Sequence, residues 1–575
     1  MKQLLFLLVA ALFSGHIFCQ TYITNISLID VENRRLITNQ TIVINGNIIS
    51  KITPSKKIIP AAGAIIINGE GKFLMPGMTD AHVHFFQSGG LYARPDAIDL
   101  RKYRPYENEI AWVHQNMEDF LRRYLQNGIT SVIDVGSTVH FLQQRDTFKN
   151  KTYAPSIYMT GPLITTYEPA VFKNLGNDEP FFLANTEEEA RNMVQKQLPF
   201  KPDFIKIWYI AALGDNVEET AKKYLPLVKA AIDEAHKNNL RVAVHATERI
   251  TAQLAVESGC DYLVHDVEDE IVKEDFLQLL KKKNIVLCPT LIVADNYGKT
   301  FAQQISFSSS SLLRANPVQL GSLNDLKHLK DSNMVALYAE AGNKENFIDK
   351  KGDSIRKINL KKMVDAGITI AGGTDAGNIG TLHATSFFDE LKAMQEAGMS
   401  NWQVIQAVTI NGAKAAGKEK QSGSIVVGKI ADLILLNANP IDKLDNLQAL
   451  DLVVNKGIVV KPDTLIHETA LALVDRQLNA YNARNLDAFL EPYADDIELY
   501  DFPDKLLSKG KTEMRKQYLW FDKVPGLHCE IMSREIHGNI IIDNERVTGV
   551  GDKPVEATTI YYIESNKIKK VYFIE

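Results

Sequence analysis

The chain has 575 residues, too many for one ordinary domain, so two or three domains are expected. Hydrophobic residues make up 45% and charged residues 23% of the chain, which is ordinary for a soluble globular protein and leaves ample apolar surface for a core. The net charge of −6 and the lack of a lysine–arginine run argue against nucleic acid as a partner.

The first residues, 1–19, predict a secretory signal peptide. A positive charge at Lys2 precedes a short apolar segment, residues 4–13, which is too short to span a membrane as a stable helix. Cleavage at its end would leave a secreted or periplasmic protein with no membrane anchor. A lipoprotein attached through Cys19 is the alternative, but the bulky Phe18 argues against it. The remaining cysteines form an odd, scattered set that predicts no disulfide framework: Cys260, Cys288 and Cys529.

Strand-like runs occur in two separate stretches of the chain. Residues 21–73 contain alternating runs, and the Asn-Gly pair at 45–46 is typical of a tight hairpin turn. Residues 423–460 have the same character. We therefore expect strands in both stretches.

The most informative motif is Asp80-Ala81-His82-Val83-His84, which follows an apolar run and a Pro-Gly break. Side chains in a β-strand alternate between faces, so residues two apart point the same way. His82 and His84 would therefore face one point, within reach of a shared divalent ion. By itself the motif also fits one buried and one exposed histidine in a loop.

Four later segments, each strand-like, carry a further residue able to bind a metal. These residues are Lys206, His245, His265 and Asp375. Lys206 lies in the middle of an apolar strand, where a charged amine is costly, and the other three each end a strand. Helical patterns at 221–238 and 250–258 separate the strands. A potential ligand at most strand ends predicts an α/β fold, a (β/α)8 barrel with a metal site at its mouth.

Other helices are predicted at 112–126 and 402–416, the latter from apolar residues at helical spacing. The long stretch 296–364 separates the seventh and eighth strands, and we expect it to be a helical excursion or a cover over the site.

The pattern changes from residue 467 onward. Helices at 471–482 and 485–490 precede a run of antiparallel strands, at 497–500, 528–537, 540–548, 555–565 and 568–574. Helices followed by antiparallel strands predict an α+β domain, residues 467–575.

Together these motifs resemble the amidohydrolase superfamily, and within it the imidazolonepropionase-like and prolidase-like metal-dependent hydrolases. The matching pieces are residues 80–84, 205–207, His245, His265, 373–377 and the return strand at 423–433. The resemblance covers residues 21–461. It implies a TIM barrel at residues 74–416 and a small β-sandwich made from both flanks, residues 20–73 and 417–461.

The resemblance also implies a divalent-metal centre, for which histidine and carboxylate ligands favour zinc, with manganese or iron as alternatives. Its ligands would be His82, His84, Lys206, His245, His265 and Asp375. With Lys206 carboxylated, the set holds two Zn²⁺ ions that the modified lysine bridges. With Lys206 unmodified, the set without His265 holds a single metal. In either case Asp375 would be catalytic, taking a proton from the metal-activated water and passing it to the leaving nitrogen.

Other polar residues near the strand ends are weaker candidates. His383 follows the eighth strand and would contact substrate or orient the catalytic aspartate, although a surface histidine fits equally well. Glu248 and Asp266 follow ligand histidines and would support them or cap helices. Asp134 ends the second strand, where the family has a structural aspartate. His140 is interpreted as a solvated helix residue.

The C-terminal domain is similar to the ketosteroid-isomerase-like, SnoaL-like cone fold, on residues 481–489 and 497–501. Asp501 stands where the isomerases have their base. However, Gln477 replaces their first-helix tyrosine, and Thr558-Thr559 lies where their proton-donating acid is expected. The resemblance therefore implies a small-molecule pocket or a dimerisation module, hence a homodimer, over an enolising isomerase.

The expected function is metal-dependent hydrolysis of an amide or cyclic-amide bond in a dipeptide-like or heterocyclic small molecule. Residues 208–212 replace the glycine-rich turn of the prolidase-like branch, which argues against a prolidase-type substrate. Deamination or imidazolonepropionase-like ring opening at a mononuclear site is one alternative, and ester or lactone hydrolysis is another. A non-catalytic binding platform is the alternative from a different class.

Overall fold

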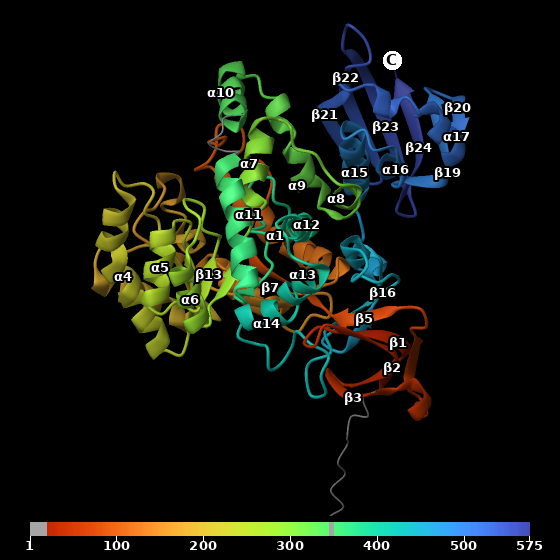
Figure 1. Cartoon of the computed structure of the whole chain (residues 1–575). Coiled ribbons are helices and arrows are strands. Elements are labelled where there is room, and N and C mark those ends of the chain that lie inside the picture. Colours follow the sequence, from red (N-terminus) through yellow and green to blue (C-terminus); the bar gives the residue numbers. More distant parts are fainter. Residues whose placement is uncertain (1–19, 344–349, 575) are drawn as a thin grey trace, which may run out of the picture.

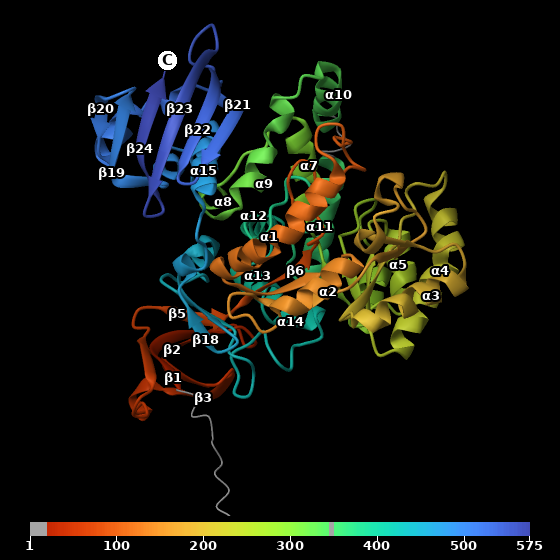
Figure 2. The ribbon, with the colours of Figure 1, turned by 180° about the vertical axis from the view of Figure 1, so that it is seen from behind.

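The computed structural model describes residues 20–343 and 350–574, so the predicted signal peptide lies outside the described residues. Figure 1 shows an N-terminal sheet (red) at one end, a central body of strands and helices, and the C-terminal domain (blue) at the other end; Figure 2 shows them from behind. Among the described residues, no helix is long and apolar enough to cross a membrane.

The two flanks of the central body form one eight-stranded sheet. Its order is β18-β17-β16-β5-β1-β2-β3, with β4 on β1. The junction is β5, which runs parallel to β1 and antiparallel to β16, so that Leu74 pairs with Leu435. The bounds are β1 (Thr21–Asp30), β2 (Arg35–Asn45), β3 (Ile48–Pro54), β4 (Ile65–Asn68), β5 (Phe73–Pro76), β16 (Leu433–Leu436), β17 (Leu450–Asn455) and β18 (Ile458–Val460).

The central body contains two parallel sheets. A three-stranded sheet has the order β6-β7-β8, and a seven-stranded sheet has the order β10-β9-β11-β12-β13-β14-β15. The bounds are β6 (Met78–Val83), β7 (Ile129–Asp134), β8 (Ser156–Met159), β9 (Leu163–Thr165), β10 (Phe181–Leu183), β11 (Phe204–Trp208), β12 (Arg241–His245), β13 (Tyr262–Val264), β14 (Val286–Cys288) and β15 (Thr369–Ile370). Between β8 and β9, Pro162 lacks the N–H that a continuous ladder needs. A closed eight-stranded barrel thus stays a prediction.

Hydrogen bonds nevertheless join β6 to the segment after β15. The Ala81 N–H donates to the Gly372 carbonyl at 2.9 Å, and the Asp375 N–H donates to the His82 carbonyl at 2.8 Å. Further along, Val83 and Ala376 form a parallel bridge. The first and last strands of the central body therefore meet at the residues that the motifs predicted to be functional.

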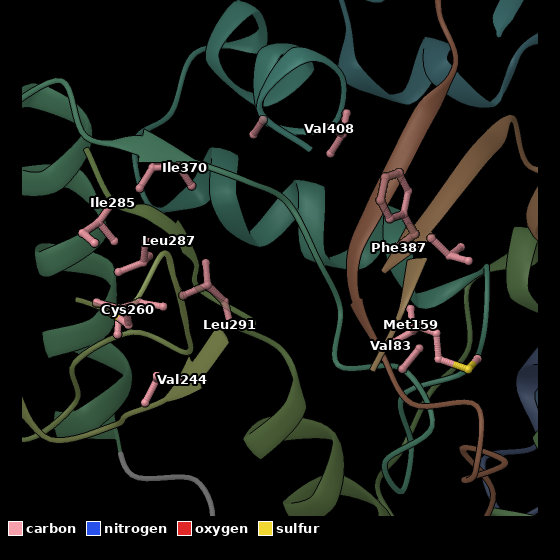
Figure 3. Close-up of a cluster of buried hydrophobic side chains, with 14 of the residues drawn as sticks. Val83, Met159, Val244, Cys260, Ile285, Leu287, Leu291, Ile370, Phe387 and Val408 are labelled. Atoms are coloured by element: carbon pink, nitrogen blue, oxygen red, sulfur yellow. The ribbon is translucent and has the colours of Figure 1, made fainter. Parts of the chain in front are cut away.

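Helices alternate with these strands. They are α1 (Tyr106–Gln126), α2 (Val139–Phe148), α3 (Glu187–Gln197), α4 (Val217–Lys237), α5 (Arg249–Glu257), α6 (Glu274–Lys282), α12 (Ser386–Glu396), α13 (Asn401–Ala407) and α14 (Ile410–Ala415). Their apolar faces pack on the strands in one continuous core, in which Ile285, Leu287 and Ile370 lie close together (Figure 3). The α/β class predicted from the sequence is confirmed.

The single helix predicted at 402–416 is wrong, because the structure has two helices there. The Val408 carbonyl accepts a hydrogen bond from the Thr79 N–H of β6 at 2.7 Å. This carbonyl therefore bonds to a strand and not to an N–H group of its own helix. The Thr409 hydroxyl donates back to the Ile405 carbonyl at 2.6 Å. A tertiary contact to β6 therefore ends α13 and starts α14 in a new direction.

The excursion between β14 and β15 is helical, as predicted. It contains α7 (Val293–Phe301), α8 (Ser309–Arg314), α9 (Pro317–Ser322), α10 (Ser332–Asn343) and α11 (Lys350–Asp365). Asn316 caps α9 by accepting from the N–H groups of Val318 and Gln319. This cap and Pro317 at the first helical position explain why a short helix forms at that point.

The C-terminal part folds into a six-stranded sheet of order β20-β19-β24-β23-β22-β21 with helices. The elements are α15 (Ala470–Asn482), α16 (Leu486–Leu490), β19 (Tyr493–Asp501), β20 (Lys505–Lys509), α17 (Lys511–Gln517), β21 (His528–His537), β22 (Ile540–Thr548), β23 (Val555–Glu564) and β24 (Lys567–Ile574). The expectation of purely antiparallel strands is wrong, because β19 and β24 run parallel. The sequence analysis also missed β20 and α17, whose short polar segments have weak periodicity.

The C-terminal part packs on the excursion. Arg476 of α15 is buried and donates to the Leu312 carbonyl of α8 at 2.6 Å, while Asn479 donates to the Pro317 carbonyl at 2.8 Å. One hydrophobic cluster contains residues of both parts, among them Leu320 and Val474. The two parts therefore share a core.

A glycine at the meeting of β6 and the last strand gives a test of this closure. A Cβ added at Gly373 would lie 2.5 Å from the His82 backbone nitrogen and 2.7 Å from the Cys288 Sγ. We expect Gly373→Ala to reduce the free energy of unfolding by about 2 kcal/mol or more, because backbone atoms must move. Urea unfolding measures this. Gly551→Ala, at a position with open space, is the control, and equal stability of the two variants would contradict the close contact.

Candidate metal centre

His82 and His84 meet Asp375 at the end of β6. The two Nε2 atoms lie 3.2 Å apart, and each lies near the Asp375 Oδ1, at 3.2 Å and 3.1 Å respectively. The His84 Nδ1 lies 2.7 Å from the Gly136 carbonyl, so it carries the ring proton and donates it there. The lone pair of the His84 Nε2 therefore faces a carboxylate oxygen, an arrangement that a bound cation between them would stabilise.

His265 approaches the same point from the end of β13. Its Nδ1 lies 2.7 Å from the Thr290 hydroxyl, which leaves Nε2 for the site. Its ring centroid lies 5.0 Å from that of His82 and 4.3 Å from that of His245. Ligand atoms of His82, His265 and Asp375 all lie within 4.8 Å of one another. The structure thus gathers nitrogen and oxygen ligands of the kind that zinc prefers.

Three residues of this centre have a left-handed backbone. His265 has φ +76°, Asp375 has φ +61° and Thr290 has φ +49°. These conformations are costly for residues with a Cβ, most of all for the β-branched threonine, and they persist only where the surroundings enforce them. They turn the chain sharply after each strand, so that the side chains point to one place.

Two buried carboxyl groups hold the backbone around the ligands. Asp80 accepts hydrogen bonds from the Thr374 hydroxyl at 2.8 Å and its N–H at 3.0 Å. Asp134 accepts from the N–H groups of Phe85 and Gly136, both at 3.1 Å. Burial raises the pKa of each carboxyl to about 7. Asp134 has the structural contacts that the sequence predicted, whereas the analysis gave Asp80 no role although it opens the motif.

The electrostatic state of the ligands suits a divalent cation. Burial lowers the pKa of His82 to about 4 and those of His245 and His265 well below their ordinary value, so all three imidazoles are neutral at pH 7. Although burial opposes ionisation, the neighbouring His82 and His84 hold the pKa of Asp375 well below its usual range. Neutral imidazoles beside an ionised carboxylate are the protonation states that metal binding requires.

Lys206 lies on β11 with 1% of its surface exposed. Burial lowers the pKa of its amine to about 7, although the charge of Asp375 opposes that shift. A substantial fraction of the amine is therefore uncharged and nucleophilic at neutral pH.

A cavity of about 760 Å³ opens over these residues. It is lined by His84, Lys206, His245, His265 and Asp375 together with aromatic side chains of the wall, Phe86, Phe181, Trp208 and Tyr297. Its size suits a small molecule. Five of the six residues predicted as ligands thus line one cavity, and the sixth, His82, is fully buried.

The sequence analysis missed a polar chain on the cavity wall. Asn378 donates to the Asp375 Oδ1 at 2.7 Å and accepts from Arg94 at 2.6 Å and from the Tyr297 hydroxyl at 2.8 Å. Arg94 in turn pairs with Asp96 at 2.6 Å. Tyr297 lies in α7, but Arg94, Asp96 and Asn378 lie in loops, where no periodicity reveals their positions, although Asn378 follows the Gly-Thr-Asp motif closely.

His383 does not line this cavity. Its ring is buried between Phe85 and Phe120, with centroids at 5.3 Å and 4.7 Å. Its Nε2 donates to the Gln87 carbonyl at 2.9 Å, and its Nδ1 accepts from the Tyr124 hydroxyl at 3.0 Å. Both nitrogens are therefore engaged, and His383 supports the backbone after β6 where the sequence had suggested contact with substrate.

Of the remaining weak candidates, Glu248 and Asp266 line the cavity and His140 does not. Glu248 lines it and accepts from the Thr251 hydroxyl at 2.7 Å at the start of α5, although it does not cap the helix with its side chain. Asp266 also lines it, and burial raises its pKa well above the ordinary value. His140 is half exposed on α2, but its Nδ1 lies 3.2 Å from Asp178. The interpretation of His140 as merely solvated is therefore incomplete.

The C-terminal part has a cavity of its own, of about 280 Å³, with aromatic walls. Asp501, the predicted base position, is not among the lining residues and pairs with Lys505 at 3.1 Å. The carboxyl group in the cavity is Glu545 of β22, which the sequence analysis missed. A chain of donated hydrogen bonds leads to it: Tyr493 to Gln477 at 3.2 Å, Gln477 to Tyr561 at 3.1 Å, and Tyr561 to Glu545 at 2.9 Å.

Comparisons with known proteins show the family to which most of the chain is related. Residues 73–462 match the model of the amidohydrolase family. Imidazolonepropionase from Picrophilus torridus is 23% identical over 458 residues, 76% of this chain and 96% of that protein. Enamidase from Eubacterium barkeri is 23% identical over 237 residues, 39% of this chain and 50% of that protein. Three curated relatives, this enamidase included, are matched over 61% of their own length or less.

Among solved structures, a Xaa-Pro dipeptidase with bound methionine in the active site superposes with a TM-score of 0.58. It is 23% identical and covers 77% of this chain and 100% of that chain. At this identity the likeness shows the fold alone.

The hydrogen bond from His265 to Thr290 predicts a change in metal affinity. Thr290→Val keeps the shape but removes the partner of the His265 Nδ1, so the ring loses its fixed orientation. We expect zinc affinity to fall about 10- to 100-fold, measured by competition with a chelator. Thr409→Val, at a buried threonine whose hydroxyl bonds to Ile405, is the control. Unchanged zinc affinity in Thr290→Val would exclude His265 as a ligand.

The C-terminal cavity predicts a pH-dependent stability. Burial raises the pKa of Glu545 to about 7, above its value in an unfolded chain. Ionisation therefore costs stability as pH rises from about 4 to above 7. We expect Glu545→Gln to match the wild type at pH 4 and to be more stable by on the order of 2 kcal/mol at pH 8, in chemical unfolding. Glu564→Gln, at an exposed position of β23, should show no such pH dependence.

Proposed function

Because the chain belongs to the amidohydrolase family, we propose that it is a metal-dependent hydrolase that cleaves the C–N bond of an amide or cyclic amide. The observation that most supports this proposal is the convergence of His82, His84 and His265 on Asp375 at the floor of a cavity. Three further features support it: neutral imidazoles, an ionised carboxylate and room for a small substrate.

The proposed scaffold is a (β/α)8 barrel formed by both parallel sheets. The hydrogen bonds from Ala81 to Gly372 and from Asp375 to His82 support closure between the first and last strands. Functional residues then lie at the carboxyl ends of the strands, where barrels of this kind carry their sites. The two flanking stretches, which share one eight-stranded sheet, would curve into the β-sandwich beside the barrel.

We propose two zinc ions, held by His82, His84, His245, His265 and Asp375 with a carboxylated Lys206 between them. When bound, such metals lower the pKa of water and polarise a carbonyl group. The depressed pKa of Lys206 supports the modification, since the uncharged amine is the form that combines with CO2. Carboxylation turns a buried cation into an anion beside the proposed cations.

Asp375 is the proposed catalytic base and acid. It accepts the proton from the attacking water and delivers it to the leaving nitrogen. Asn378 holds the Asp375 Oδ1 at 2.7 Å and is itself held by Arg94, so the carboxylate keeps its direction during both transfers. Phe181 and Trp208, whose rings stack with centroids 4.9 Å apart, form an apolar wall that keeps water from one side of the cavity.

Ring opening of a heterocycle at a single metal is the second candidate. The relation to an imidazolonepropionase over 96% of that protein favours it. In that case Lys206 would stay unmodified beside one ion.

The appended domain is proposed to have the ketosteroid-isomerase-like fold and to bind a small molecule or pair with a second copy. Its cavity around Glu545 supports the binding role. Export through residues 1–19 is likewise a proposal from the sequence.

Metal content and intact mass separate the two candidates. In the purified mature protein we expect about two zinc ions per chain, together with the added mass of CO2 on Lys206 under non-denaturing conditions. One zinc and no added mass would support the mononuclear ring-opening enzyme. No metal after zinc is supplied would contradict both and leave a binding platform.

Asp375→Asn tests the proton transfer. The amide keeps the size of the carboxylate but cannot accept a proton, so we expect most metal to remain and turnover of an amide or cyclic-amide substrate to fall about 100- to 10,000-fold. Asp269→Asn is the matched control, since Asp269 also lines the cavity but accepts from the Arg249 N–H. Turnover that survives in Asp375→Asn with metal bound would exclude the proposed role.

A further inference from the structure

A second histidine–carboxylate cluster lies outside the candidate centre. His114 of α1, His140 of α2 and Asp178, in the 3-10 turn η3 (Gly176–Asp178), offer ligand atoms that all lie within 4.8 Å of one another. The His114 Nε2 lies 2.9 Å from the Asp178 Oδ1, and the His140 Nδ1 lies 3.2 Å from the Asp178 Oδ2. Three separate elements thus converge on one carboxylate.

The hydrogen bonds around His114 determine which ring nitrogen carries its proton. The Gln144 side-chain amide donates to the His114 carbonyl at 2.9 Å, so its oxygen faces the His114 Nδ1, at 2.6 Å. Flipping the Gln144 amide would set two carbonyl oxygens against each other. The Nδ1 therefore donates to Gln144, and in neutral His114 the lone pair of Nε2 points at the Asp178 carboxylate.

An ion pair between protonated histidines and Asp178 does not suit this arrangement. The His114 ring is sandwiched between Phe141, with centroids 3.8 Å apart, and His140, with centroids 3.9 Å apart. Protonating both histidines would place two cationic rings 3.9 Å apart, centroid to centroid, beside a single carboxylate. A divalent cation between Nε2 of His114, Nδ1 of His140 and Asp178 leaves both rings neutral and gives every lone pair a partner.

We propose that His114, His140 and Asp178 form a second, structural site for a divalent transition-metal ion, and that this ion is zinc. Two nitrogens and one carboxylate, with half of His140 exposed to admit water as a fourth ligand, are a usual zinc set. Tetrahedral zinc needs ligand atoms roughly 3.3 Å apart, close to the spacing of the two nitrogen–oxygen pairs. The bond from His114 to Gln144 is the outer contact that orients ligating histidines.

The position of the site gives it a role in shaping the candidate centre. It fastens the turn at Asp178 to α1 and α2, and Phe181, three residues later, lines the catalytic cavity. On the other side, the Thr138 hydroxyl donates to Asp178 at 3.2 Å, two residues after the Gly136 carbonyl that orients His84. The ion would hold one wall of the cavity without touching substrate.

Zinc content per chain tests the proposal in the full-length mature protein, saturated with zinc and freed of excess by gel filtration. We expect His140→Asn and Asp178→Asn each to hold one zinc ion fewer than the wild type, and zinc to raise their melting temperature less. The matched control is His236→Asn: His236 also lies on a helix, partly exposed, and pairs with one carboxylate, Asp261, at 3.0 Å. It should retain the wild-type zinc content.

The expected loss of one ion is a difference between variants, so it does not depend on whether the candidate centre holds one metal or two. The zinc counts expected above refer to the candidate centre alone and are measured in Asp178→Asn, whereas the wild type would hold one ion more. Circular dichroism confirms that each variant is folded, and Asp178→Asn serves if His140→Asn is unstable. Equal zinc content in the wild type, His140→Asn and Asp178→Asn would overturn the proposal and leave an ion-paired cluster.

Discussion

The meeting of β6 with the segment after β15 is the contact on which the rest of the site depends. The buried carboxyl of Asp80 holds both the hydroxyl and the N–H of Thr374, and the next residue, Asp375, donates its N–H to the His82 carbonyl. Two elements almost 300 residues apart are thereby fixed at hydrogen-bond distance. Without this contact the carboxylate of Asp375 would not face the histidines of β6, and the proposed metal site would lack its carboxylate.

The packing of the surrounding core offsets the unfavourable free energy of this arrangement. Asp80, Asp134 and Lys206 are buried ionisable groups, and His265 and Asp375 have left-handed backbones. Each feature is unfavourable by itself, and together they require a well-packed frame. The helices that cover the parallel strands supply that frame, and Phe387 and Val408 show how closely the last helices approach them (Figure 3).

The sequence predicted the strand-end ligands because they obey simple periodicities. An alternation of two places His82 and His84 on one face, and apolar runs that stop at His245, His265 and Asp375 mark strand ends. The sequence did not predict the break between helices at Thr409, the chain of polar contacts through Asn378, or the place of Glu545 in the second cavity. Those features arise from contacts between distant segments, such as Thr79 with Val408, which no local pattern records.

The shared hydrophobic cluster of the excursion and the C-terminal part constrains how this protein can evolve. Leu312 and Leu320 lie in the same cluster as Leu473 and Val474, and the buried Arg476 bonds to the backbone of the excursion. A lineage that lost the appended domain would expose Leu312 and Leu320 of the excursion to water. Loss of that domain would therefore require other substitutions in the excursion to cover or replace this apolar surface.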